Sequence, residues 1–172
     1  DEVGSRGLGD VYKRQAITLI RNQVKGANVG VGTVCNATEF DSAVDAGANF
    51  VVSPGQSDAL FDRALLTNIP FLPGAVTATE VMASKEAGFN VLKFFPASTS
   101  GGAAAIKAFA GPFADLQFVP TGGINLDNAG SYLSLSNVRA VGGSWLTPAD
   151  AIQNGQWEHI TQVAREASQL GA

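Results

Sequence analysis

Short apolar runs recur along this sequence at nearly even intervals, and this recurrence restricts the fold more than any other feature. The runs begin near residues 29, 49, 71, 91, 116 and 139, about every 20 to 25 residues, and the last extends from Arg139 to Leu146. Stretches with helical spacing of apolar residues lie between them. Each repeat has the length of a βα unit, and runs that are apolar throughout are typical of parallel strands buried on both faces. The sequence therefore predicts an α/β fold built on parallel strands.

Two architectures produce this alternation, the open doubly wound sheet and the closed TIM (β/α)8 barrel. The even spacing favours the barrel, since no Gly-x-Gly-x-x-Gly opens a helix with an acidic residue about twenty positions further on. A complete barrel needs roughly 200 or more residues, and the chain has 172. We therefore expect residues 15–172 to form a single partial TIM (β/α)8 barrel domain that lacks about the first two βα units. Residues 1–14 show no helical or strand period and are expected to form a loose tail.

The predicted helices carry clear start signals. Asn36 or Thr38 is placed to cap a helix that ends near Ala46. Thr77 and Glu80 have the spacing of a capping box, in which each side chain binds a backbone N–H group of the other's segment. Helices are thus predicted to begin near residues 38 and 77.

Composition excludes several classes of partner. The net charge of −4 and pI of about 4.8, without a basic stripe, argue against nucleic acid. No apolar run is long enough to span a membrane and no signal peptide is recognisable, so a cytoplasmic location is expected. One cysteine, Cys35, and one histidine, His159, give no metal pattern, and we expect a buried thiol and a packed or surface imidazole. No metal or cofactor is expected.

Lys93 is the residue most suggestive of chemistry, because it interrupts the apolar run Asn-Val-Leu-Lys-Phe-Phe-Pro-Ala at residues 90–97. A strand over Val91 to Pro96 would bury it, and burial lowers the pKa of a lysine toward that of a free amine. Such an amine can attack a carbonyl and form a Schiff base. The alternative is a structural lysine whose stem crosses the core and whose head meets water or a carboxylate.

Glycine pairs close the last two predicted strands, where barrels of this kind often bind phosphate. Gly122–Gly123 follows one strand beside Thr121, and Gly142–Gly143 follows the other beside Ser144. Each pair alone is also compatible with a tight turn. Together, with two hydroxyl groups beside them, they favour a phosphate site, which an acidic protein can build from backbone N–H groups. No carboxylate closes a strand, so no general base for Lys93 is found in this chain.

Six motifs, in order and at matching spacing, make the chain from about residue 15 onward resemble the 2-keto-3-deoxy-6-phosphogluconate (KDPG) aldolase family, which are class I aldolases of the Entner–Doudoroff pathway. The family also includes activity on 4-hydroxy-2-oxoglutarate. The motifs are Gly30-Val-Gly-Thr-Val34, Ser53-Pro-Gly55, Pro70-Phe-Leu-Pro-Gly74, Lys93-Phe-Phe-Pro-Ala97, Pro120-Thr-Gly-Gly-Ile124 and Gly142-Gly-Ser-Trp145.

The resemblance implies a homotrimeric (β/α)8 barrel that cleaves a small phosphorylated keto acid into pyruvate and glyceraldehyde 3-phosphate without a metal. It implies that Lys93 forms the Schiff base. Carried over position by position, it also implies substrate-binding roles for Thr33, Pro54, Phe95 and Thr121, and phosphate-binding roles for Gly122, Gly123, Gly143 and Ser144.

The chain departs from the family pattern at its beginning. The family's general-base glutamate and a substrate-binding arginine lie in a Glu-x-Thr-x-Arg run, and ungapped counting places Ser5 and Gly9 at those positions. We therefore expect a truncated or chimeric aldolase. Two alternatives stay open: an aldolase for the epimeric phosphogalactonate compound, and an inactive phosphosugar-binding fragment without the general base.

Overall fold

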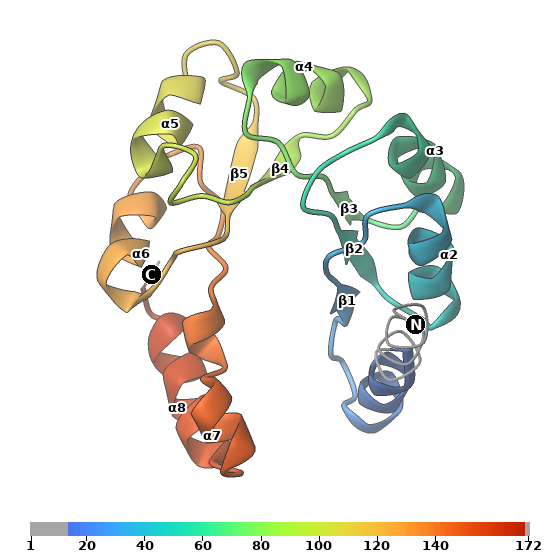
Figure 1. Cartoon of the computed structure of the whole chain (residues 1–172), viewed down its shortest axis with the longest axis vertical. Helices are drawn as coiled ribbons and strands as arrows, with labels where there is room; N and C mark the ends of the chain where they lie inside the picture. Colours follow the sequence, from blue (N-terminus) through green and yellow to red (C-terminus); the bar gives the residue numbers. More distant parts are fainter. Residues whose placement is uncertain (1–13, 171–172) are drawn as a thin grey trace, which may run out of the picture. The chain divides into compact units, whose positions relative to one another are not determined.

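Strands and helices alternate along the computed structural model, which describes residues 14–170 (Figure 1). The chain divides into two units, of which the first ends at Gly74 and the second begins at Ala75. Among the described residues no helix is long and apolar enough to cross a membrane. Within residues 14–170 there is also no cluster of three His, Cys, Asp or Glu side chains that would hold a metal ion.

The first unit is a parallel three-stranded sheet with helices between its strands. Gly30 pairs with Phe50, and Val51 pairs with Phe71, in the order β1-β2-β3. The rings of Phe40 and Phe71 meet edge to face, 5.6 Å apart, in its core. A helix covers residues 14–23, and the elements that follow are β1 (Gly30–Val31), α2 (Ala37–Asp45), β2 (Phe50–Val52), α3 (Asp58–Thr67) and β3 (Phe71–Leu72).

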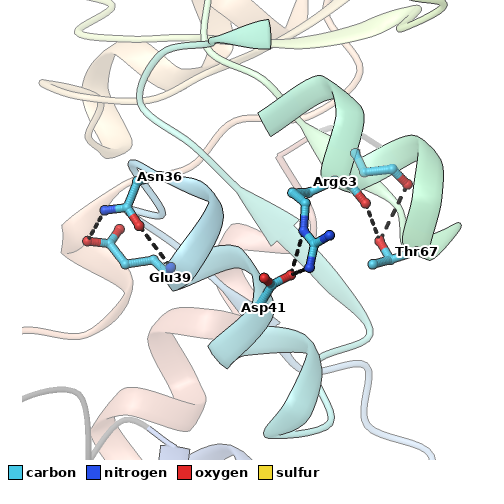
Figure 2. Close-up of polar contacts among 6 residues, drawn as sticks. Asn36, Glu39, Asp41, Arg63 and Thr67 are labelled. Carbon is cyan, nitrogen blue, oxygen red and sulfur yellow. Dashed lines mark hydrogen bonds and ion pairs between the residues drawn. The ribbon is translucent and has the colours of Figure 1, made fainter. Parts of the chain in front are cut away.

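Of the two predicted caps, Asn36 and Thr38, the start of α2 uses Asn36 (Figure 2). Asn36 Oδ1 accepts the Glu39 N–H at 2.9 Å, and the Glu39 carboxylate accepts the Cys35 N–H at 2.6 Å. The prediction of a buried Cys35 is wrong, since its side chain is exposed. Val34 beside it is buried, and successive side chains of an extended segment point to opposite sides. Arg63 of α3 pairs with Asp41 and joins the two helices (Figure 2).

The second unit pairs two four-residue strands in parallel, with Lys93 opposite Val119. Within it α5 packs against α6, and α7 against α8 (Figure 1). Its elements are α4 (Ala78–Glu86), β4 (Val91–Phe94), α5 (Gly102–Phe109), β5 (Gln117–Pro120), α6 (Leu126–Leu133), the 3-10 helix η1 (Ser144–Leu146), α7 (Ala149–Gln153) and α8 (Trp157–Ala167).

The faces of β4 and β5 differ in burial. Leu92, Phe94 and Phe118 are fully buried in one cluster with Ile106 of α5. Burying a side chain of this size contributes about 1.5 to 3 kcal/mol. Lys93 lies on the opposite face and is half-buried. The alternation of the strand thus keeps the lysine away from the core beneath the helices.

The predicted strand from Arg139 to Leu146 does not form. Two isolated bridges, Phe118 to Val138 and Thr121 to Gly142, replace it, and Ser144–Leu146 is the 3-10 helix η1. The N–H groups of Arg139 and Gly142 donate to the carbonyls of Phe118 and Pro120, each at 3.0 Å. Between the two bridges, residues 139–141 therefore lie opposite residues 119–120, three residues against two. The extra residue interrupts the ladder of hydrogen bonds as a β-bulge does.

Candidate active site

Lys93 and Phe95 stand at the end of β4. The Lys93 Nζ atom lies 4.5 Å from the centroid of the Phe95 ring, within the range of a cation–π contact. The Lys93 carbonyl accepts the Ala75 N–H at 2.9 Å, which fixes the strand at this residue. The amine therefore lies near the C-terminal end of β4, beside the Phe95 ring. Phe95 itself is 37% exposed.

Thr121 lies immediately beyond β5, and both its backbone N–H and its carbonyl form hydrogen bonds with residues at or just after the end of β4. Its N–H donates to the Phe94 carbonyl at 3.0 Å, and its carbonyl accepts the Ala97 N–H at 2.8 Å. Since Val119 is opposite Lys93 and side chains alternate, Thr121 shares the face of the sheet that carries Lys93. The Thr121 Oγ1 atom is buried and has no hydrogen-bond partner among the described residues. A threonine hydroxyl can donate a hydrogen bond to a carbonyl or carboxylate oxygen.

Gly122 and Gly123 form the turn between β5 and α6. Both have positive φ, 92° and 74°, a conformation that favours glycine. The Phe95 ring would lie 3.1 Å from a Cβ atom at Gly122, so it packs directly on this turn. Within residues 14–170 the N–H groups of Gly122 and Gly123 donate to no acceptor. Backbone N–H groups in this arrangement suit an anion.

The second glycine pair lies against the first. Gly142 bridges to Thr121, and a Cβ atom at Gly143 would lie 2.7 Å from the Ile124 carbonyl oxygen. Ser144 begins η1 and is exposed. The structure thus brings together the predicted residues of the second unit, which are Lys93, Phe95, Thr121, Gly122, Gly123, Gly143 and Ser144.

The two remaining predicted residues belong to the first unit. Thr33 follows β1 with φ of 64°, an unusual value for a residue other than glycine, and its side chain is exposed. It lines a cavity of about 160 Å³ together with Glu39 and Arg14. Pro54 follows β2 and is half-buried, with its carbonyl close to Gly74. The substrate-binding roles of Thr33 and Pro54 stay predictions.

The decisive comparison is with families of known proteins. The sequence model of the KDPG and KHG aldolases matches residues 10–163. This chain belongs to that family. The resemblance deduced from the six motifs is therefore confirmed.

Individual members of the family are close in sequence and in fold. The 2-dehydro-3-deoxy-phosphogluconate aldolase of Dickeya dadantii is 46% identical over 153 residues, which are 89% of this chain and 72% of that protein. The KHG/KDPG aldolase of Escherichia coli K12 is 45% identical over 152 residues, 88% of this chain and 71% of that protein.

A solved structure extends the likeness to the fold. The KDPG aldolase of Legionella pneumophila, with pyruvate captured as a covalent carbinolamine, superposes with a TM-score of 0.87 at 40% identity. The match covers 90% of this chain and 75% of that one. The predicted α/β class with parallel strands is confirmed.

Sequence reasoning missed Asn128, although it contacts the glycine turn of this aldolase. Its side-chain amide donates to the Gly123 carbonyl at 2.9 Å. A signal was available, because Asn125 and Asn128 have the spacing of a capping box with asparagine in place of glutamate or glutamine. Trp145 was also missed as a neighbour of the site, and its ring lies against Gly143.

Proposed function

We propose that this chain is a Schiff-base aldolase that cleaves 2-dehydro-3-deoxy-6-phosphogluconate to pyruvate and glyceraldehyde 3-phosphate, with Lys93 as the nucleophile. One observation carries the proposal: Lys93 lies near the C-terminal end of β4, on the same face of the sheet as Thr121. The Thr121 hydroxyl has no hydrogen-bond partner among the described residues. The names of the Dickeya and Escherichia relatives support the substrate. The latter name also supports cleavage of 4-hydroxy-2-oxoglutarate.

The chemistry follows from the amine. Lys93 Nζ attacks the C2 ketone to give a carbinolamine, and loss of water leaves an iminium. The C3–C4 bond then breaks, its electron pair moves into the iminium as an enamine, and the C4 hydroxyl loses its proton to a base as the aldehyde forms. Protonation of the enamine at C3 and addition of water release pyruvate and restore the amine. Thr121 would hold the pyruvate end while this occurs, and Phe95 would line the pocket.

The phosphate end has a matching environment in the glycine turns. The N–H groups of Gly122 and Gly123 lack acceptors among the described residues, and Gly143, followed by Ser144, lies close to Ile124 at the end of the same turn. We assign these four residues to the phosphate of the substrate. Neutral N–H donors bind phosphate without a local lysine or arginine, which is consistent with the acidic composition.

The finer architecture is also part of the proposal. We assign the strands to a (β/α)8 barrel of which this chain supplies about six βα units, within one domain over residues 15–172. The parallel pairing in both units and the TM-score of 0.87 to a family structure support it. The homotrimer implied by the family resemblance and the cytoplasmic location expected from the sequence stay predictions.

Borohydride reduction in the presence of pyruvate tests the nucleophile. The expected result is a stable pyruvate-derived mass on Lys93, located by peptide mass spectrometry. Lys93→Ala should abolish it, whereas Lys107→Ala, which removes an exposed lysine of α5, should leave it unchanged. A folded sample that gives no adduct on Lys93 would overturn the proposed function.

A further inference from the structure

Three successive carbonyl groups of the glycine turn, those of residues 121–123, accept hydrogen bonds from other parts of the second unit. The Thr121 carbonyl accepts the N–H of Ala97 at 2.8 Å, and the Gly122 carbonyl accepts the N–H of Ser98 at 3.1 Å. The third, that of Gly123, is bound by the side-chain Nδ2 of Asn128 at 2.9 Å. Two of these donors belong to the backbone, and only the third depends on a side chain.

These bonds fix where the turn's N–H groups point. In a trans peptide the carbonyl and the N–H of one unit point in opposite directions. Because the carbonyls of residues 121–123 point toward these donors, the N–H groups of residues 122–124 point the opposite way, away from the donors. Across residues 14–170 these three N–H groups meet no acceptor. The Asn128 contact alone sets the orientation of the last of the three peptide units.

Asn128 is itself held firmly. Its Oδ1 accepts the Asn125 N–H at 2.9 Å, while Asn125 Oδ1 accepts the N–H groups of Asp127 and Asn128 at 3.0 and 3.1 Å. Reversing the amide would place its oxygen against the Gly123 carbonyl, so the partners determine its orientation. The first turn of α6 and the glycine turn are thus joined as one unit.

We propose that Asn128 is a positioning residue of this aldolase: by binding the Gly123 carbonyl, it presents the N–H groups of residues 122–124 to the phosphate-bearing end of the substrate. The proposal rests on the proposed function for the identity of the ligand. Gly123 has positive φ and the flexibility of glycine. Without Asn128 its peptide unit rotates, and the bound phosphate loses a donor.

The test measures binding of glycerol 3-phosphate to the full chain by isothermal titration calorimetry. This probe has the phosphate end but no carbonyl, so it does not react with Lys93. Asn128→Ala should weaken binding about tenfold, the effect of one hydrogen bond to a charged group. The yield of the pyruvate adduct at Lys93 should be unchanged, because that end of the site does not use the turn.

Two further variants separate positioning from stability. Asn137→Ala is the matched control, since Asn137 Nδ2 also binds a backbone carbonyl, that of Ile106 at 2.7 Å, away from the turn. It should lower the melting temperature without changing glycerol 3-phosphate affinity. Asn128→Leu keeps the approximate size of the side chain, carries no charge and cannot donate to the Gly123 carbonyl, so it serves if Asn128→Ala does not fold.

The binding and adduct measurements together distinguish failure of the positioning role from failure of the Schiff-base function. Wild-type affinity in a folded Asn128→Ala variant overturns the proposal, and so does wild-type affinity in Asn128→Leu if the alanine variant does not fold. Absence of glycerol 3-phosphate binding by the wild-type chain also overturns it. If binding depends on Asn128 but pyruvate forms no adduct, the positioning role stands and the Schiff-base function fails.

Discussion

Gly143 shows how a single hydrogen atom in place of a side chain can shape the site. A Cβ atom at this residue would lie 1.8 Å from Cζ3 of Trp145 and 2.7 Å from the Ile124 carbonyl oxygen. Both distances are far below van der Waals contact. Trp145 packs against the core cluster of the second unit, so its ring cannot move away freely. The residue therefore allows the two glycine turns to approach each other.

We expect Gly143→Ala to destabilise the protein by about 2 kcal/mol or more, the effect of forcing atoms into a packed region. Chemical denaturation with urea would measure it. Removing the ring in the double variant Gly143→Ala with Trp145→Ala should recover part of the loss relative to the sum of the single variants.

Gly130 provides the matched control. It lies inside α6, and a Cβ atom there would meet nothing within 4 Å. Gly130→Ala should therefore stabilise the protein by about 0.5 to 1 kcal/mol through helix propensity. Equal effects of the two substitutions would contradict the steric argument.

The site residues differ in how far sequence could predict them. Lys93, Thr121 and the glycine pairs were identified from their places at strand ends, and the structure gathers them in one unit. Asn128 was missed because its importance depends on a hydrogen bond to a turn, which no apolar pattern records. Burial of Cys35 was wrong because an apolar run does not specify which side its last residue faces.

At the scale of elements, α4 carries a start signal that the structure confirms. The Thr77 side chain accepts the Glu80 N–H, and the Glu80 carboxylate accepts the N–H groups of Thr77 and Val76 at 2.8 and 2.9 Å. Burial acts to raise the pKa of Glu80, but these hydrogen bonds and one from the Thr77 hydroxyl outweigh it. The pKa of Glu80 is consequently held below its ordinary value of 4.5.

This shift predicts a pH-dependent effect of Glu80→Gln. A depressed pKa in the folded state contributes stability above the ordinary pKa, and the contribution is lost as pH falls through the folded value. At pH 7 we expect a loss of about 0.5 to 1 kcal/mol, toward the lower end because Glu80 is only partly buried. The difference from wild type should vanish in acid.

Thermal unfolding at several pH values would measure this dependence. Glu86→Gln is a suitable control, since Glu86 is exposed in the last turn of the same helix. A Glu80→Gln difference that stays constant from pH 7 to acid would show that the carboxylate's charge contributes nothing to the cap.

The helices were easier to predict than the last strand. Helix starts depend on local side-chain contacts, such as those of Asn36 and Thr77, which lie within four residues of their partners. The segment from Arg139 to Leu146 is apolar enough for a strand, but its pairing depends on register with Phe118 and Thr121, about twenty residues away. An extra residue between the bridges cannot be recognised from the segment itself.

For the molecule as a whole, family membership is better determined than architecture. Motifs distributed over both units predicted the family, and the comparisons confirm it over most of the chain. Closure of a barrel and assembly of a trimer depend on contacts between distant surfaces, which spacing along a chain does not specify. These remain predictions for the same physical reason.

The last prediction concerns the general base of the reaction. The sequence predicts a nucleophile without its general base, and several carboxylates are already engaged in the structure. Glu39 and Glu80 bind helix caps, and Asp41 and Asp115 pair with Arg63 and Lys85. We therefore expect the chain to form an imine with pyruvate but to remove the C3 proton slowly.

Exchange of the pyruvate methyl protons in D2O, followed by proton NMR, separates the two steps. Imine formation makes these protons acidic, but their removal requires a base near C3. Borohydride should trap the adduct efficiently, while methyl exchange should be only a few-fold faster than with Lys93→Ala in the same buffer. Rapid exchange that depends on Lys93 would show that a residue of this chain acts as the base, and it would refute the prediction that none is present.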